Sequence, residues 1–277
     1  MSWTEITRAQ YRRSNERYAS DLTDEEWLIL SPHLPVPRKL GRLRTTNLRE
    51  IINAILYLLQ TGCQWRMLPK DFPPMSTVQG YFYTWRDDGL WTNINNHLVM
   101  AARAMMDKEE HPTVAVIDSQ SVKTTESGGP RGYDAGKKIK GRKRHIGTDI
   151  NGFLLGAIVH EANIQDRDGA AATLLSFANR YPWARHIFAD SGYAGDKLVQ
   201  DLAGKGRWVI EIVKRPQDAK GFVLLPKRWV VERTFAWLNR NRRLAKGVEG
   251  TIASAAAMLF LVSVKMLIRR LAMKKIA

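Results

Sequence analysis

Two aspartates in the sequence follow short apolar runs of strand length and precede small polar residues. Asp118 ends such a run in "VAVIDSQSVKTT" (residues 114–125), and Asp190 ends another in "RHIFADSGYAG" (residues 185–195). Ligand sites in an α/β sheet form beyond the carboxyl ends of its strands, so the two carboxylates converge if their strands are neighbours. Adjacent carboxylates repel, a divalent cation relieves the repulsion, and Mg²⁺ prefers oxygen ligands. Either Asp alone is ordinarily a cap or a turn residue, but the pair predicts a metal site.

Glu232 is predicted to be the third acid of this site. It lies in "RWVVERTFAWLNRNRR" (residues 228–243), where helical phase places Asn239 and Arg243 on nearly the same face. A carboxylate aligned with cationic donors can hold a metal while an arginine grips a substrate phosphate. The alternative is an exposed Glu in ordinary ion pairs on a helix surface.

Four other acids are weighed against these three. Asp149 lies in a predicted hairpin turn with Asn151 and Gly152, and turn chemistry explains it. Asp166 and Asp168 precede a helix and are expected to cap it. Asp134 lies in an irregular loop that the pattern does not place.

A dense basic run enters the first strand of the predicted hairpin, close to the proposed metals. A cationic segment there is expected to track a DNA backbone without reading bases, and the alternative is a solvated loop. The run comprises Lys137, Lys138, Lys140, Arg142, Lys143 and Arg144.

Charge and composition favour a polyanionic partner. The chain has 43 Lys and Arg against 27 Asp and Glu, a formal charge of +16, and neutralising phosphates releases condensed counterions. The lone Cys63 excludes an intramolecular disulfide and suits a reducing compartment. The polar N-terminus argues against secretion. The most apolar run, residues 251–264, stops at Lys265, short of the ~20 residues that span a bilayer, and predicts a buried helix.

The elements that must position these residues fall into two predicted regions. Residues 1–107 read as a helical, helix-turn-helix-like DNA-binding domain, and its alternative is an all-helical packing or dimerisation domain. Its helices are expected after Asp21 or Thr23, from Leu48 to Leu59 with Gly62 ending it, after Pro74 with Ser76 as cap, and from about 91 to 106.

Residues 112–277 read as an α/β domain with C-terminal helices. A strand ending at Asp118 is followed by a hairpin (143–149 and 153–160), a helix over 169–179 and a strand ending at Asp190. A helix closed by Gly204 or Gly206, a strand over 207–213 and a long helical segment over 227–244 complete it. This order predicts a mixed sheet and is that of a ribonuclease-H-like domain, although order alone supports several α/β folds.

At these residues the chain resembles the bacterial DDE transposases, specifically the insertion-sequence-five family. The similar segments occur in the right order over nearly the whole chain: "LTDEEWLILSPHLP", "TGCQWRMLP", "TWRDDGLW", "VIDSQSVKTT", "GRKRHIGTDINGFLL", "FADSGYAG" and "WVVERTFAWLNRNRRL". The resemblance implies a ribonuclease-H-like domain with Asp118, Asp190 and Glu232 as its metal-binding triad.

The family also carries a Tyr, Arg, Glu, Lys pattern around the last acid. Arg228 matches its Arg, but Leu225 and Asn239 stand where the Tyr and the Lys are expected. Arg240 or Arg243 could supply the missing cation.

The resemblance implies a DNA transposase that binds terminal inverted repeats and catalyses strand cleavage and transfer with Mg²⁺, or Mn²⁺ as a substitute. The expected partners are double-stranded DNA, as element ends and target, and a homodimer or larger assembly that joins two ends, with no membrane. The expected location is the bacterial cytoplasm, at the nucleoid when the protein is bound to DNA. The alternatives are a metal-dependent nuclease on the same fold and a catalytically silent DNA-binding regulator.

Overall fold

The computed structural model describes residues 13, 16–36, 44–126, 128–213 and 227–275. Leu225, which stands at the family's Tyr position, lies outside these residues.

The N-terminal region is helical, as predicted. Thr23 begins its first helix with a capping box, in which the Thr23 hydroxyl and the Glu26 carboxylate each accept the other residue's backbone N–H. Gly62 ends the next long helix at φ +72, a conformation that glycine adopts without strain. Ser76 is not a cap, because its helix already begins at Met75. The elements are α2 (Asp24–Leu30), η1 (Ser31–His33), α3 (Leu48–Thr61), η2 (Trp65–Met67), α4 (Met75–Asp87) and α5 (Leu90–Ala104).

The rest of the described chain forms a mixed sheet with helices. Its elements are β1 (Val114–Lys123), β2 (Gly132–Asp134), β3 (Ile139–Thr148), β4 (Leu154–Glu161), α6 (Asp166–Ala178), β5 (His186–Ala189), η3 (Ser191–Tyr193), α7 (Asp196–Leu202), β6 (Val209–Ile212), α8 (Trp229–Asn239), η4 (Arg242–Leu244) and α9 (Ile252–Lys275). The hairpin of β3 and β4 turns at residues 149–153, with Gly152 at φ +87.

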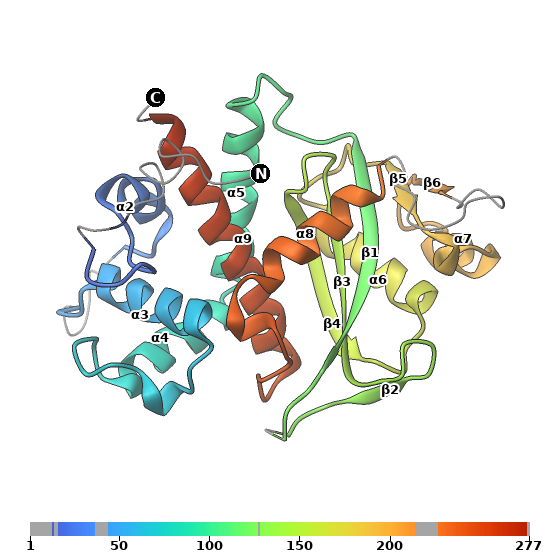
Figure 1. Ribbon diagram of the computed structural model, residues 1–277. Helices are drawn as coiled ribbons and strands as arrows, with labels where there is room; N and C mark the ends of the chain where they lie inside the picture. Colours follow the sequence, from blue (N-terminus) through green and yellow to red (C-terminus); the bar gives the residue numbers. More distant parts are fainter. Residues whose placement is uncertain (1–12, 14–15, 37–43, 127, 214–226, 276–277) are drawn as a thin grey trace, which may run out of the picture.

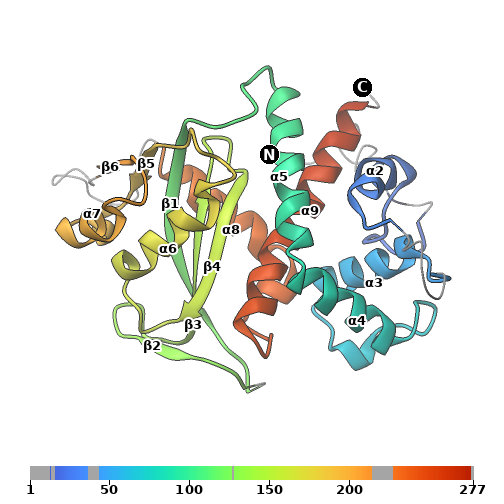
Figure 2. The same cartoon turned by 180° about the vertical axis from the view of Figure 1, so that it is seen from behind.

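The strand order places β1 in the middle of the sheet. β3 is antiparallel to β1 and to β4, and the short β2 also pairs with β3. On its other edge β1 is parallel to β5, which is parallel to β6. Helix α8 crosses one face of the sheet and α6 covers the other (Figures 1 and 2).

Two predicted element ends were wrong. β1 does not end at Asp118 but continues to Lys123, because its antiparallel partner β3 pairs with it from Val116 to Lys123. The last helical segment does not run to Leu244: α8 ends at Asn239, and Arg243 lies in the separate turn η4.

Helix α9 joins the helical region to the sheet. It packs against α5 and α2 on one side and against β4 on the other (Figure 1). The Asn95 amide of α5 also donates to the Leu154 carbonyl oxygen of β4 over 2.7 Å. The buried apolar side chains form one connected core from Leu22 to Leu271. The change in secondary structure near residue 112 is therefore not a break in the core.

The buried helix predicted near the C-terminal end is confirmed but is longer than expected. It continues through Lys265, which is itself buried. Its span Ile252–Met273 is long and apolar enough to cross a membrane, but 72% of the most apolar window is buried inside the protein. Burial of this kind is typical of a core helix.

Candidate active site

Parallel pairing brings Asp118 and Asp190 together. Val116 of β1 lies opposite Phe188 of β5, and the same register continued by two residues sets Asp118 level with Asp190. Neighbouring strands are about 4.8 Å apart, so the two side chains leave the sheet at one place. The carboxylates therefore converge although Asp118 lies inside its strand.

The electrostatics of Asp118 reflect this convergence. Burial raises the pKa of its carboxyl to about 7, and the negative charge of Asp190 adds to the rise. The backbone N–H of Ser119, which donates to Asp118 Oδ1 over 2.7 Å, and the cations of Arg228 and Lys137 oppose it. The site contains acids that repel each other and nearby cations that partly compensate them.

Glu232 reaches the site through Arg228. Helix α8 contacts β1 and β3, and Arg228 is its N-cap residue. One guanidinium nitrogen of Arg228 lies 3.6 Å from Asp190 Oδ2 and 3.2 Å from Glu232 Oε1. The Glu232 side chain is 48% exposed, so this side of the site is open to solvent.

Asp166 belongs to the same cluster and was missed. It is not a cap but lies in the first turn of α6, and its Oδ1 accepts from Ser119 Oγ over 2.7 Å and from Lys143 Nζ over 2.8 Å. Burial alone would raise the pKa of Asp166, but the hydrogen bonds from Lys143 and Ser119 lower it overall. The acid and its two partners come from three elements, so no local sequence signal could have found it.

The electrostatic surroundings of Tyr193 also place the acids in one region. Its side chain is buried, and burial together with the charges of Asp118, Asp166 and Asp190 raises its pKa well above the ordinary value. Its hydroxyl lies 3.3 Å from His145 Nδ1, inside the protein. Its position in "DSGYAG" gave no hint of these surroundings.

The basic run predicted at residues 137–144 divides into two parts. Lys137 and Lys138 are exposed in the turn between β2 and β3, and Lys140 is exposed at the start of β3. Residues 142 to 144 are buried in β3, which contradicts the prediction that they track a DNA backbone. Their charged groups form hydrogen bonds inside the protein. Arg142 donates to the carbonyl oxygens of Pro130 and Glu249, and Arg144 donates to that of Leu244. Lys143 donates to the Ile164 carbonyl oxygen and pairs with Asp166.

Asp134 anchors the exposed part of the basic run. It ends β2, and its Oδ2 accepts from Ser121 Oγ over 2.5 Å while its Oδ1 accepts from the backbone N–H of Lys137. The irregular loop expected here is therefore a short strand and an ordered turn. Asp149 is a turn residue as predicted, but its fully buried carboxylate also pairs with Arg103 of α5.

The two arginines predicted to act beside Glu232 also differ in exposure. Arg240 is exposed at the C-cap of α8. Arg243 is buried in η4, where its Nε donates to Glu249 Oε1 over 2.6 Å and its Nη1 donates to Cys63 O. Arg243 is thus not on the face of Glu232, because the helix stops four residues earlier.

The donor chemistry of the three acids fits a divalent cation. All are oxygen donors, which Mg²⁺ prefers, and a cation would relieve both the burial and the repulsion from Asp190 that raise the pKa of Asp118. Among the described residues, no three His, Cys, Asp or Glu side chains stand close enough to form a ready metal cage. Arg228 now bridges two of the acids.

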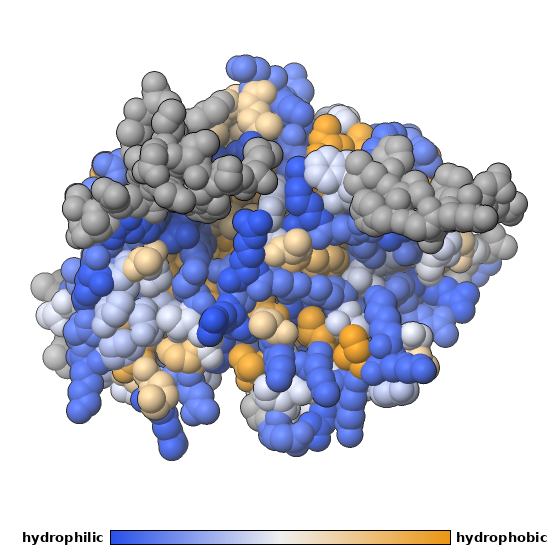
Figure 3. Space-filling view, viewed as in Figure 1, coloured by the Kyte–Doolittle hydropathy of each residue, from blue (hydrophilic) through white to orange (hydrophobic). Residues whose placement is uncertain are grey.

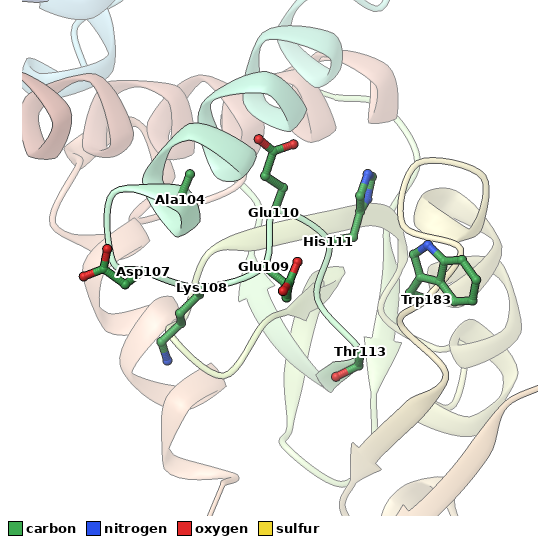
Figure 4. A pocket seen from close by; sticks show the side chains of 8 residues that line it. All are labelled: Ala104, Asp107, Lys108, Glu109, Glu110, His111, Thr113 and Trp183. Atoms are coloured by element: carbon green, nitrogen blue, oxygen red, sulfur yellow. The ribbon is translucent and has the colours of Figure 1, made fainter.

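A separate cavity of about 710 Å³ lies at the opposite end of β1 (Figure 4). It is lined by the segment from Ala104 to Thr113 and by Trp183, and it contains none of the three acids. Glu109, Glu110 and Asp107 give it a negative character that does not suit DNA.

Comparisons with known proteins place the chain in a family. Residues 109–267 match the family described as "Transposase DDE domain", and residues 22–95 match "Putative transposase of IS4/5 family". The first match covers more than half of the chain. The chain therefore belongs to the DDE transposase family, and the predicted ribonuclease-H-like domain behind a helical region is confirmed.

Two relatives come from Burkholderia cepacia. The "Putative transposase for insertion sequence element IS402" is 34% identical over 115 residues, which are 38% of this chain and 52% of that protein. The "Insertion element IS402 uncharacterized 16.2 kDa protein" is 32% identical over 114 residues, which are 39% of this chain and 76% of that protein. The match thus spans about half the length of the first relative. No solved structure matches the chain.

Proposed function

We propose that this DDE transposase binds the terminal inverted repeats of an insertion sequence and catalyses metal-dependent cleavage and strand transfer. The observation that carries the proposal is the convergence of Asp118 and Asp190 on parallel strands, with Glu232 joined to Asp190 through Arg228. The proposed location is the bacterial cytoplasm, and a protein dimer or larger assembly would hold two DNA ends.

Asp118, Asp190 and Glu232 would hold Mg²⁺, with Mn²⁺ as a substitute. When bound, the metal activates the attacking oxygen and stabilises the leaving oxygen of an in-line displacement at phosphorus. The half-exposed Glu232 leaves the site open on the side from which a DNA strand can enter. Arg228, which lies beside Asp190 and Glu232, could donate to the non-bridging oxygens of the phosphate.

The two reactions differ only in their nucleophile. In cleavage, a water oxygen forms a bond to phosphorus and the bond to the 3′-oxygen breaks, which leaves a 3′-hydroxyl and a 5′-phosphate. In transfer, that 3′-hydroxyl attacks a phosphorus of target DNA and the target strand leaves with its own 3′-hydroxyl. No covalent bond to the protein is required.

A joining assay tests the proposed function. The protein and Mg²⁺ would be incubated with a plasmid that carries a marker between the two DNA segments bordering the gene, and products would be separated on a gel. We expect molecules in which element 3′ ends are joined to target DNA. Cleavage without joining would instead identify a nuclease, and binding without either would identify a regulator.

We further propose that residues 1–107 recognise element ends while residues 112–277 carry the chemistry. The helix-turn-helix-like reading of the first region stays a prediction. The link between α3 and α4 runs from Gly62 to Pro74, longer than the 3–4-residue turn of that motif, whereas Asp88 and Gly89 alone separate α4 from α5.

The exposed lysines of the β2–β3 turn are expected to bind DNA phosphates. Replacing Lys137 and Lys140 with Gln, and Lys138 with Asn because its φ is +54, should weaken binding about equally for every sequence. The slope of log affinity against log salt should flatten by ~0.9 for each phosphate that the variant no longer neutralises. Fluorescence anisotropy of labelled duplexes at several salt concentrations measures both quantities.

The matched control removes three cations at the other end of the parallel strands. Arg185, Lys205 and Arg207 are exposed and precede β5 and β6, whereas the acids lie near the carboxyl end of β5. Their replacement with Gln should leave the slope nearly unchanged. Equal slopes for the two triple variants would contradict phosphate binding by the lysines, and a loss confined to one DNA sequence would mean that the turn reads bases.

A further inference from the structure

A cavity of about 700 Å³ lies between the C-terminal end of α8 and helix α9. Its lining contains Arg240, Lys265, Arg269 and Arg270, and no carboxylate among the described residues that line it. Trp237 and Phe153 provide aromatic wall. Figure 3 shows strongly hydrophilic side chains in the hollow between α9 and α8, on the face seen in Figure 1.

The positive charge of this α8–α9 pocket is poorly neutralised inside the protein. Lys265 is 4% exposed, and among the described residues its ammonium donates to two amide oxygens, those of Gln60 and of Asn241 at 2.9 Å. Arg269 lies 3.8 Å from Glu26, but Arg13 pairs with the same carboxylate. Buried cations without acidic partners cost stability, and a bound anion would offset that cost.

The pKa values of two residues that line the pocket are lowered. Burial, and then the charges of Arg269 and Arg13, lower the pKa of Lys265 to about 7. Burial, and then Arg13, lower the pKa of Arg269 to about 10. Glu26 opposes both shifts without cancelling them, so burial and the neighbouring cations decide the direction.

The aromatic wall of the pocket packs against guanidinium groups. The Arg270 guanidinium lies 5.1 Å from the Phe153 ring centroid, and the guanidinium of Arg233, which is outside the lining, lies 4.4 Å from that of Trp237. Arg270 thus lies beside apolar surface in the pocket, where a guanidinium can bind a phosphate.

Helix α8 connects the pocket to the candidate active site. Glu232 lies in the first turn of α8, and Arg240 is its C-cap residue, eight residues further on. At ~1.5 Å per residue the separation along the axis is about 12 Å, and duplex DNA rises ~3.4 Å per nucleotide. A strand with one phosphate at the acids would thus have another three to four nucleotides away near the pocket.

We propose that the α8–α9 pocket binds backbone phosphates of the DNA strand that enters the candidate active site. The proposal rests on the proposed function, because it takes DNA as the partner. The pocket holds the strand in register along α8, while the triad at the start of α8 acts on the reacting phosphate. It also supplies cations near the position where Asn239 replaces the family's Lys.

The test replaces Arg240 and Arg270 with Gln and measures anisotropy of a labelled 30-base-pair duplex of arbitrary sequence. We expect affinity at 0.1 M salt to fall about tenfold or more, and the salt slope to flatten by about 1.8 because two phosphates are no longer neutralised. The matched control, Arg185→Gln with Arg207→Gln, removes the same charge at the far end of the strands and should change neither quantity appreciably. The double Arg→Lys variant should recover most of the slope.

The outcomes separate this proposal from the function on which it rests. Unchanged binding in a folded pocket variant, or an equal loss in the control, overturns the pocket while cleavage and joining by the unaltered protein can still succeed. Weaker binding by the pocket variant, when the unaltered protein neither cleaves nor joins DNA, would refute the enzyme but support the phosphate site. Thermal unfolding of each variant checks its fold, and failure of the folded Arg→Lys variant to recover any binding would contradict charge recognition.

Discussion

Replacing Asp118 with Asn should abolish metal-dependent strand cleavage without weakening the fold. The amide keeps the shape of the side chain but lacks the negative charge that a divalent cation requires. Because metal stabilisation of a phosphoryl-transfer transition state contributes several kcal/mol, the cleavage rate should fall by about 10³-fold or more. Single-turnover cleavage of DNA carrying the element ends, at saturating Mg²⁺, measures the effect.

The same substitution should raise the thermal stability of the metal-free protein at alkaline pH. The folded protein holds the pKa of Asp118 at about 7, above the ordinary value of 3.8. The folded state therefore binds more protons than the unfolded state between these values, and stability falls as the pH rises through this window. Above pH 7 the ionised carboxylate destabilises the fold fully, and Asn removes that cost.

Asp107→Asn is a matched control. Asp107 is exposed at the opposite end of β1 and has φ +55, which Asn also tolerates. This variant should cleave at the normal rate. If Asp118→Asn retained substantial cleavage, or if it lost cleavage because its unfolding temperature had collapsed, Asp118 would not have the role assigned to it.

The largest loss of stability is expected from Arg103→Met. Arg103 is buried near the end of α5, where its guanidinium pairs with the fully buried Asp149 and donates to Glu109 O over 2.8 Å. Removing one partner leaves a buried charge without compensation, at a cost of about 3–5 kcal/mol. For a chain of this size the unfolding temperature should fall by roughly 6–20 °C.

Two further variants show whether the cost is that of an unpaired charge. Arg49→Met removes the partner of Asp24, whose side chain is 82% exposed, and should cost less than about 1 kcal/mol. Adding Asp149→Asn to Arg103→Met should restore part of the lost stability. Asp149→Asn should therefore cost less in the Arg103→Met variant than in the unaltered protein. Equal costs in the two backgrounds would mean that the two charges are not coupled.

Much of the fold could be predicted because its signals are local. Thr23 and Gly62 limit helices through their own backbone conformations, and Asn151 and Gly152 make a turn within five residues. The convergence of Asp118 and Asp190 was also accessible, since it follows from two strands that run in the same direction. Each of these inferences needs only neighbours in sequence or one pairing rule.

The missed features depend on interactions between distant segments. The basic run at 142–144 looks like a surface patch, yet β3 lies between β1 and β4, and Arg142 and Arg144 donate to carbonyl oxygens of residues about 100 positions away. In the sequence Asp166 resembles a helix cap, but in the fold its carboxylate accepts hydrogen bonds from Ser119 and Lys143. Arg243 appears on the face of Glu232 only if α8 continues, which it does not.

Helix α9 has a consequence for the order in which the protein can be made. It follows in sequence the elements that it packs against, chiefly α2, α5 and β4, and it closes the core between them. A chain emerging from the ribosome must therefore keep the apolar faces of α5 and β4 uncovered until α9 has left the exit tunnel. Ribosome-bound intermediates shorter than this point should expose hydrophobic surface to chaperones, and the native core should close only after α9 has emerged.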